Sequence, residues 1–202
     1  MGHMMHILPL RIPAVALFAA VLSAISAPAL AHVGPHGTEF GGGLTHPLSG
    51  LDHLLAALAV GLLAAQLERP ARWLLPIVFP TVMILGILAA LGGPAFGLLK
   101  PVIAGSVLIL GALIARGRQP ATVVAVPLVA VFAFLHGYGH GLAAPVQGSL
   151  LAYYAGFTAA VVALHGLGLG AGQLAAHMRL RLAARSAGAA IAALGALLLF
   201  AA

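Results

Sequence analysis

The sequence of 202 residues contains no cysteine and very few charged residues. The absence of cysteine excludes disulfide bonds, thiolate metal sites and cysteine nucleophiles. Only 6% of the residues are charged, whereas 62% are hydrophobic. A water-soluble fold of this length cannot cover its surface with so few charged groups. The composition therefore indicates an integral membrane protein, for which lipid is the solvent of most of the chain.

Two further function classes are excluded by what is missing. The formal net charge is +6, but the basic residues lie singly or in small groups between apolar runs. This pattern is typical of topology signals and not of a nucleic-acid-binding face. The chain also lacks the glycine-rich Gly-Lys-Ser/Thr motif of ATP-driven transporters. Any transport would therefore depend on an ion gradient, on the membrane potential or on trapping of the transported substrate inside the cell.

The N-terminal residues predict a cleavable signal peptide over residues 1–31. A weakly basic start ends at Arg11, an apolar stretch covers residues 12–25, and Ala29-Leu-Ala31 fits a signal-peptidase site. Cleavage would leave His32 as the new N-terminus. The alternative is an uncleaved first transmembrane helix.

The rest of the chain, residues 32–202, predicts a single all-α transmembrane domain. A membrane-spanning helix needs about 20 apolar residues, so six spans fill this length and leave no room for a soluble domain. Residues 32–45 are rich in Gly and His and are expected to be exposed and flexible. Breaks at Pro, Gly and Arg place the six helices near 51–67, 73–91, 98–115, 121–142, 148–170 and 182–202.

Arginines predict how this bundle is oriented. Cytoplasmic loops are enriched in basic residues, and seven arginines lie on alternate loops. Lys100 lies on the opposite side, where its long side chain can reach the interface. We therefore expect a multi-pass protein of the bacterial inner membrane with both mature termini outside. The seven arginines are Arg69, Arg72, Arg116, Arg118, Arg179, Arg181 and Arg185.

Ionisable residues cluster near the outer ends of three predicted spans. Such residues are costly in a membrane and are usually retained for function. His136 and His140 are four residues apart, so they share one helix face at a spacing that allows two imidazoles to bind one metal ion. The alternative is a pair of structural histidines that bond to neighbouring helices. The full set of candidate metal ligands is His46, Asp52, His53, His136, His140 and His165.

Asp52 has three possible roles. It could bind a metal directly, or orient a ligating imidazole through a hydrogen bond. It could instead be a carboxylate stabilised by the dipole at a helix N-terminus, which leaves the neighbouring His53 unexplained. Imidazoles with one carboxylate and no sulfur favour nickel, cobalt, zinc or copper over magnesium or calcium. His32 and His36, with Glu39, form a possible outer capture site or are incidental residues of a solvated tail.

Three segments resemble a known family. The string His46-Pro-Leu-Ser-Gly-Leu-Asp52-His53-Leu-Leu, followed by Ala59-Val-Gly61, resembles the first-helix signature of the HupE/UreJ family of nickel and cobalt permeases. Phe134-Leu-His136-Gly-Tyr-Gly-His140-Gly and the segment from Gly156-Phe-Thr158 to His165-Gly-Leu-Gly168 are similar to its later signatures. At Lys100 and near Ala143 this chain lacks acidic residues that are common in the family.

The resemblance implies uptake of nickel, or of cobalt, for metalloenzymes such as hydrogenase or urease. It also implies metal-binding roles for the six candidate ligands. We therefore expect a permease for a divalent transition metal, with no catalytic residue and no prosthetic group. Two other functions stay open: an intramembrane zinc-dependent hydrolase with Asp52 as general base, and an assembly factor with a static metal site.

Overall fold

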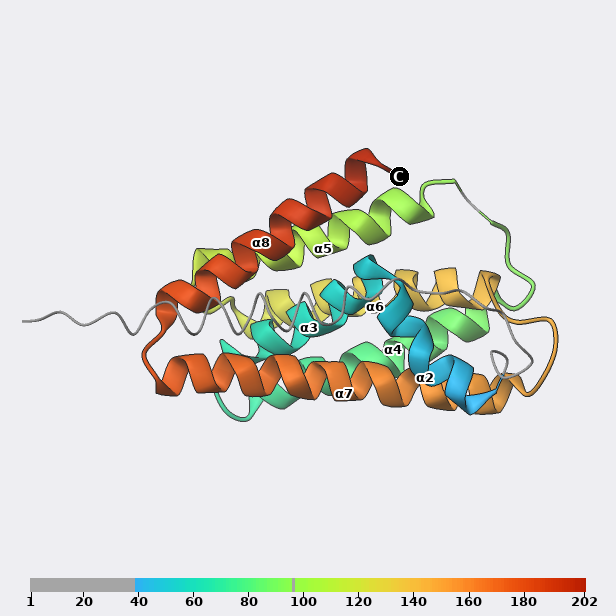
Figure 1. Ribbon diagram of the computed structural model, residues 1–202, viewed down its shortest axis with the longest axis horizontal. Helices are drawn as coiled ribbons and strands as arrows, with labels where there is room; N and C mark the ends of the chain where they lie inside the picture. Colours follow the sequence, from blue (N-terminus) through green and yellow to red (C-terminus); the bar gives the residue numbers. More distant parts are fainter. Residues whose placement is uncertain (1–38, 96) are drawn as a thin grey trace, which may run out of the picture. The chain divides into compact units, whose positions relative to one another are not determined.

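The computed structural model describes residues 39–95 and 97–202 (Figure 1). The predicted signal peptide and the possible capture residues His32 and His36 lie outside these residues. The described part of the chain is helical and contains no strand. It comprises α2 (Phe40–Ser49), α3 (Leu51–Ala65), η2 (Ala71–Trp73), α4 (Leu74–Ala90), α5 (Leu99–Arg116), α6 (Thr122–Leu142), α7 (Leu150–His177) and α8 (Arg181–Phe200).

The predicted all-α membrane fold is confirmed. In the described residues, five helical segments are long and apolar enough to cross a membrane, and these segments contain α4, α5, α6, α7 and α8. The pair α2 and α3 passes the same test only as a broken span, because its two halves are bent by 87°. With 15 residues, α3 extends about 22 Å at 1.5 Å per residue, which is shorter than the hydrocarbon core of about 30 Å. The start of α3 is therefore expected to lie within the membrane.

Helix α3 forms the centre of the bundle. It packs against α7 and α5, while α4 pairs with α6 and α5 pairs with α8. Glycines allow these helices to approach closely: a Cβ on Gly61 of α3 would overlap the backbone carbonyl of His165 on α7. A Cβ on Gly137 of α6 would likewise overlap the carbonyl of Met83 on α4. The glycines beside His136 and His140 thus bring α6 against α4.

Residues 32–45 were expected to be flexible and exposed; residues 40–45 are helical, which contradicts the first expectation, whereas most of them are exposed as expected. These residues belong to α2, which crosses α7 (Figure 1). Gly43 of α2 and Gly156 of α7 make the crossing possible, because a Cβ at either position would overlap backbone of the other helix. Packing of this kind stabilises a short helix that its glycine-rich sequence would not form alone.

The connections rich in arginine lie together at one end of the bundle. The segments that join α3 to α4, α5 to α6 and α7 to α8 are at the left of Figure 1. Arg185 of α8 donates a hydrogen bond from Nε to the carbonyl of Ala115 at the end of α5, at 2.9 Å. Helix α6 ends and α7 begins at the opposite end, where the C-terminus of α8 also lies (Figure 1). The arginines of these connections therefore lie at one end of the bundle, and Lys100 in the first turn of α5 lies at the other.

Candidate metal site

Four imidazoles from three helices meet near the less basic end of the bundle. His46 belongs to α2, His53 to α3, and His136 and His140 to α6. The ring centroids of His53 and His140 are 4.3 Å apart, those of His46 and His140 5.1 Å, and those of His53 and His136 5.8 Å. Metal–nitrogen bonds of about 2.0–2.1 Å give two imidazoles on one ion a comparable separation. We call these four residues the histidine cluster.

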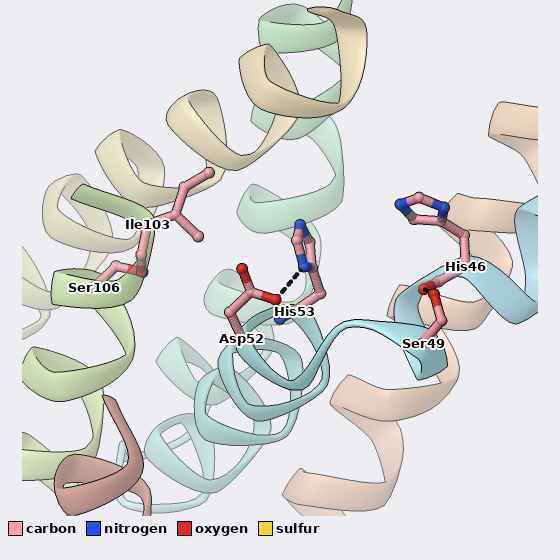
Figure 2. A network of polar contacts seen from close by, with 6 residues as sticks. All are labelled: His46, Ser49, Asp52, His53, Ile103 and Ser106. Atoms are coloured by element: carbon pink, nitrogen blue, oxygen red, sulfur yellow. Dashed lines mark hydrogen bonds and ion pairs between the residues drawn. The ribbon is translucent and has the colours of Figure 1, made fainter. Parts of the chain in front are cut away.

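Asp52 holds the ring of His53 (Figure 2). The Nδ1 atom of His53 lies 2.6 Å from Oδ1 of Asp52, and the backbone N–H of His53 donates to the same oxygen at 2.9 Å. An ionised carboxylate only accepts hydrogen bonds, so Nδ1 of His53 carries the proton. The other ring nitrogen, Nε2, is then left with its lone pair free to bind a cation. A carboxylate that fixes a metal-binding histidine in this way is a common feature of metal sites.

His136 is fixed in the same tautomer by its own helix. Its Nδ1 atom lies 2.8 Å from the backbone carbonyl of Phe132, which can only accept a hydrogen bond. The ring is 2% exposed, and its Nε2 has no hydrogen-bond partner among the described residues. The Nε2 lone pair is therefore buried and unpaired.

His140 is packed between aromatic rings and its neighbours in the cluster. Its centroid is 4.3 Å from that of Phe157, and the residue is 6% exposed. Its Nε2 is also buried without a hydrogen-bond partner in the described part of the chain. The hydroxyl of Tyr154 donates to the backbone carbonyl of His140 at 2.9 Å, which ties α7 to the end of α6.

Leaving a buried polar atom unpaired costs about 1–3 kcal/mol. The cluster contains two such nitrogens, on His136 and His140, within a membrane-spanning helix. A cation bound by either imidazole would satisfy its Nε2 atom. The rings are tilted or edge-on to one another, and within residues 39–95 and 97–202 no three His, Asp or Glu side chains are already arranged to hold one ion. Binding by three imidazoles therefore requires ring rotation.

Helix ends also favour a cation at this position. Helices α2 and α6 both end here, at Ser49 and Leu142, so their partly negative carbonyl ends lie near the cluster. Helix α3 begins here, and its positive end is offset by Asp52 in its first turn. The carboxylate of Asp52 and the C-terminal ends of α2 and α6 thus make the electrostatic potential at the cluster more negative.

A small cavity adjoins the cluster. Its volume is about 10 Å³, close to the minimum for one water molecule. It is too small for a metal ion with a full shell of water. The cavity is lined by His53, Ala57, Phe79, Met83, His136, His140, Phe157 and Val161.

The structure brings five of the six predicted ligands together. His46, His53, His136 and His140 come together with Asp52, whereas the ring of His165 contacts that of Phe79 at 5.1 Å. Glu39 is exposed at the start of α2. No pattern in the sequence indicates Phe79, since a phenylalanine in an apolar run looks the same whether it faces lipid or a polar site.

Comparisons with known proteins agree with one another. Residues 19–198 match the family model described as HupE / UreJ protein. The chain is 41% identical over 180 residues to Protein HupE of Rhizobium leguminosarum bv. viciae, an alignment that covers 88% of this chain and 94% of that protein. No solved structure gives a significant match.

Proposed function

The chain belongs to the HupE/UreJ family, and from this premise we propose that it is a permease for a divalent transition metal, with nickel as its substrate and cobalt as the alternative. The family is associated with nickel and cobalt transport. We further propose that the transported ion supplies nickel enzymes such as hydrogenase or urease.

The observation that carries this proposal is the pair of buried, unpaired Nε2 atoms on His136 and His140, beside the carboxylate-held ring of His53. Neutral imidazoles with one carboxylate and no sulfur suit borderline divalent ions better than magnesium or calcium. The exposed fraction of the cluster's side chains also rises toward the less basic end, because His46 and His53 are half-buried whereas His136 and His140 are buried. The proposed route begins at His46 and His53 and continues to His140 and His136.

The positions of the arginines indicate how the bundle is oriented in the membrane. We propose that the basic end faces the cytoplasm and that the histidine cluster opens toward the outside. Ions would then be captured at the outer end, lose water at the cluster, and pass toward the arginine-containing loops. Transport needs sites that bind well enough to admit the ion and weakly enough to release it.

The experiment is uptake of nickel, cobalt, zinc and copper by proteoliposomes that contain the purified protein. Saturable flux of nickel or cobalt is expected, with its loss in His53→Ala and in His140→Ala. His177→Ala is the matched control, because this histidine is exposed at the other end of α7. Normal flux in both cluster variants would overturn the proposal. Binding without flux in the unaltered protein would indicate a static metal-binding factor.

A further inference from the structure

His165 is buried apart from the histidine cluster. The residue is 0% exposed, and neither ring nitrogen has a hydrogen-bond partner among the described residues. It lies on α7, where its backbone carbonyl faces Gly61 of α3, about two turns further along α3 than His53. A buried imidazole with two unpaired nitrogens inside a membrane bundle is costly to retain without a ligand.

The ring of Phe79 contacts both His165 and the cluster. Its centroid is 5.8 Å from that of His136 and 5.1 Å from that of His165. Phe79 is 3% exposed and forms part of the wall of the small cavity, which His165 does not line. The aromatic ring therefore closes the inner side of the cavity toward His165.

A backbone oxygen accompanies His165 on the far side of this ring. Pro80 has no N–H, so it cannot donate the usual helical hydrogen bond to the carbonyl of Pro76, four residues earlier. The Pro76 carbonyl approaches the imidazole of His165, although the geometry is not that of a full hydrogen bond. The imidazole of His165 and the carbonyl oxygen of Pro76 thus lie close together in the interior.

We infer that the ion passes through two stations in series, the histidine cluster and then His165 with the Pro76 carbonyl, and that the Phe79 ring is the gate between them. This inference rests on the proposed permease function and adds an order of binding to it. It makes Phe79 the residue that controls passage, and the cluster the place where the ion is first bound.

Physical reasons favour a gate at this point. A cavity of about 10 Å³ admits one water-sized particle, so an ion that reaches Phe79 has already exchanged most of its water for imidazole ligands. An apolar constriction then blocks both ions and water until it moves. Rotation of one aromatic ring would bring the ion within reach of His165, where two ligands hold it less strongly than the cluster does.

The test compares nickel(II) binding in detergent with nickel(II) flux into proteoliposomes. The variants are Phe79→Trp, Phe79→Ala and His165→Ala. Leu110→Ala is the control, because Leu110 packs in the same hydrophobic core and is not one of the cavity-lining residues. The thermal unfolding midpoint of each variant shows whether it has folded.

The expected result is a separation of binding from flux. Phe79→Trp and His165→Ala should bind nickel(II) at the cluster as the unaltered protein does and lose flux. Phe79→Ala should keep binding and show faster flux with a leak of protons. Folded Phe79 variants whose flux and leak match those of Leu110→Ala would overturn the gate, while flux in the unaltered protein would still support the permease. Absence of flux in the unaltered protein would overturn both.

Discussion

At the scale of single residues, the histidine cluster is prepared by its hydrogen bonds. Asp52 accepts a hydrogen bond from Nδ1 of His53, and the carbonyl of Phe132 accepts one from Nδ1 of His136. Each bond leaves the opposite nitrogen, Nε2, unprotonated and able to bind a metal. A neutral imidazole in the correct tautomer is what a divalent ion requires, because a protonated ring cannot be a ligand.

Asp52→Asn should lower the affinity for nickel(II) by about 10–100-fold, as is typical when the partner of a metal-binding histidine is lost. The amide keeps the shape of the carboxylate but removes its charge, so His53 loses its fixed tautomer. Isothermal titration of the purified protein with nickel(II) measures the change. Glu68→Gln is the control, since Glu68 is exposed at the basic end of the bundle. Equal affinity in Asp52→Asn and the control would refute the role given to Asp52.

Gly50→Ala should also weaken nickel(II) binding, although Gly50 offers no ligand atom. A Cβ at Gly50 would lie 2.7 Å from Nδ1 of His53 and 3.0 Å from Oδ1 of Asp52, so this pair must shift. The same titration measures the effect. Gly41→Ala, where a Cβ meets nothing within 4 Å, should bind as the unaltered protein does. Binding that is equally strong in both variants would show that the pair need not be held in place.

At the scale of elements, the site depends on the bend between α2 and α3. The angle of 87° carries His46 back over the start of α3 and places it beside His140 (Figure 2 shows His46 and His53 on either side of the bend). The crossing of α2 over α7 holds this arrangement. The ring of His46 also packs against those of Tyr153 and Phe157 on α7.

Gly156→Ala should displace α2 and reduce nickel uptake. A methyl group at this position would overlap the backbone carbonyl of Phe40, and overpacking of this kind costs about 1–3 kcal/mol. Gly166→Ala on the same helix is the matched control, because a Cβ there meets nothing within 4 Å. Uptake by whole cells and the thermal unfolding midpoint would be measured for both. Identical behaviour of the two variants would contradict the importance of the α2–α7 crossing.

Hydropathy made the membrane bundle predictable, and rare polar residues in apolar runs marked His46, Asp52, His53, His136 and His140 as neighbours. Two features were not predictable. Helix α2 has a sequence rich in glycine and forms through contacts with α7, which no local pattern in residues 40–45 shows. Phe79 is one apolar residue among many, and its place between His136 and His165 depends on how α4 packs against α6 and α7.

At the scale of the whole molecule, the arginine-containing loops and the histidine cluster lie at opposite ends of the bundle. The connections that carry the arginines lie at one end, and α2 with the end of α6 and the start of α7 forms the other (Figure 1). Such asymmetry predicts a fixed orientation, with the arginines in the cytoplasm. An ion bound by the histidine cluster would then enter from outside.

The absence of cysteine makes this orientation easy to test. Val146→Cys, in the exposed loop between α6 and α7, should react with a membrane-impermeant maleimide in intact cells. Arg118→Cys, in the exposed loop between α5 and α6, should react only after the cells are opened. The reverse pattern of labelling would place the histidine cluster on the cytoplasmic side and reverse the proposed direction of entry.

The most direct test of the central claim, that the imidazoles of the cluster bind the transported ion, is X-ray absorption spectroscopy of nickel(II) bound to the purified protein. The account predicts a nickel shell that contains several imidazole nitrogens, and fewer of them in His136→Ala and in His140→Ala. A shell of oxygen atoms alone, or an imidazole signal that is unchanged in both variants, would contradict it.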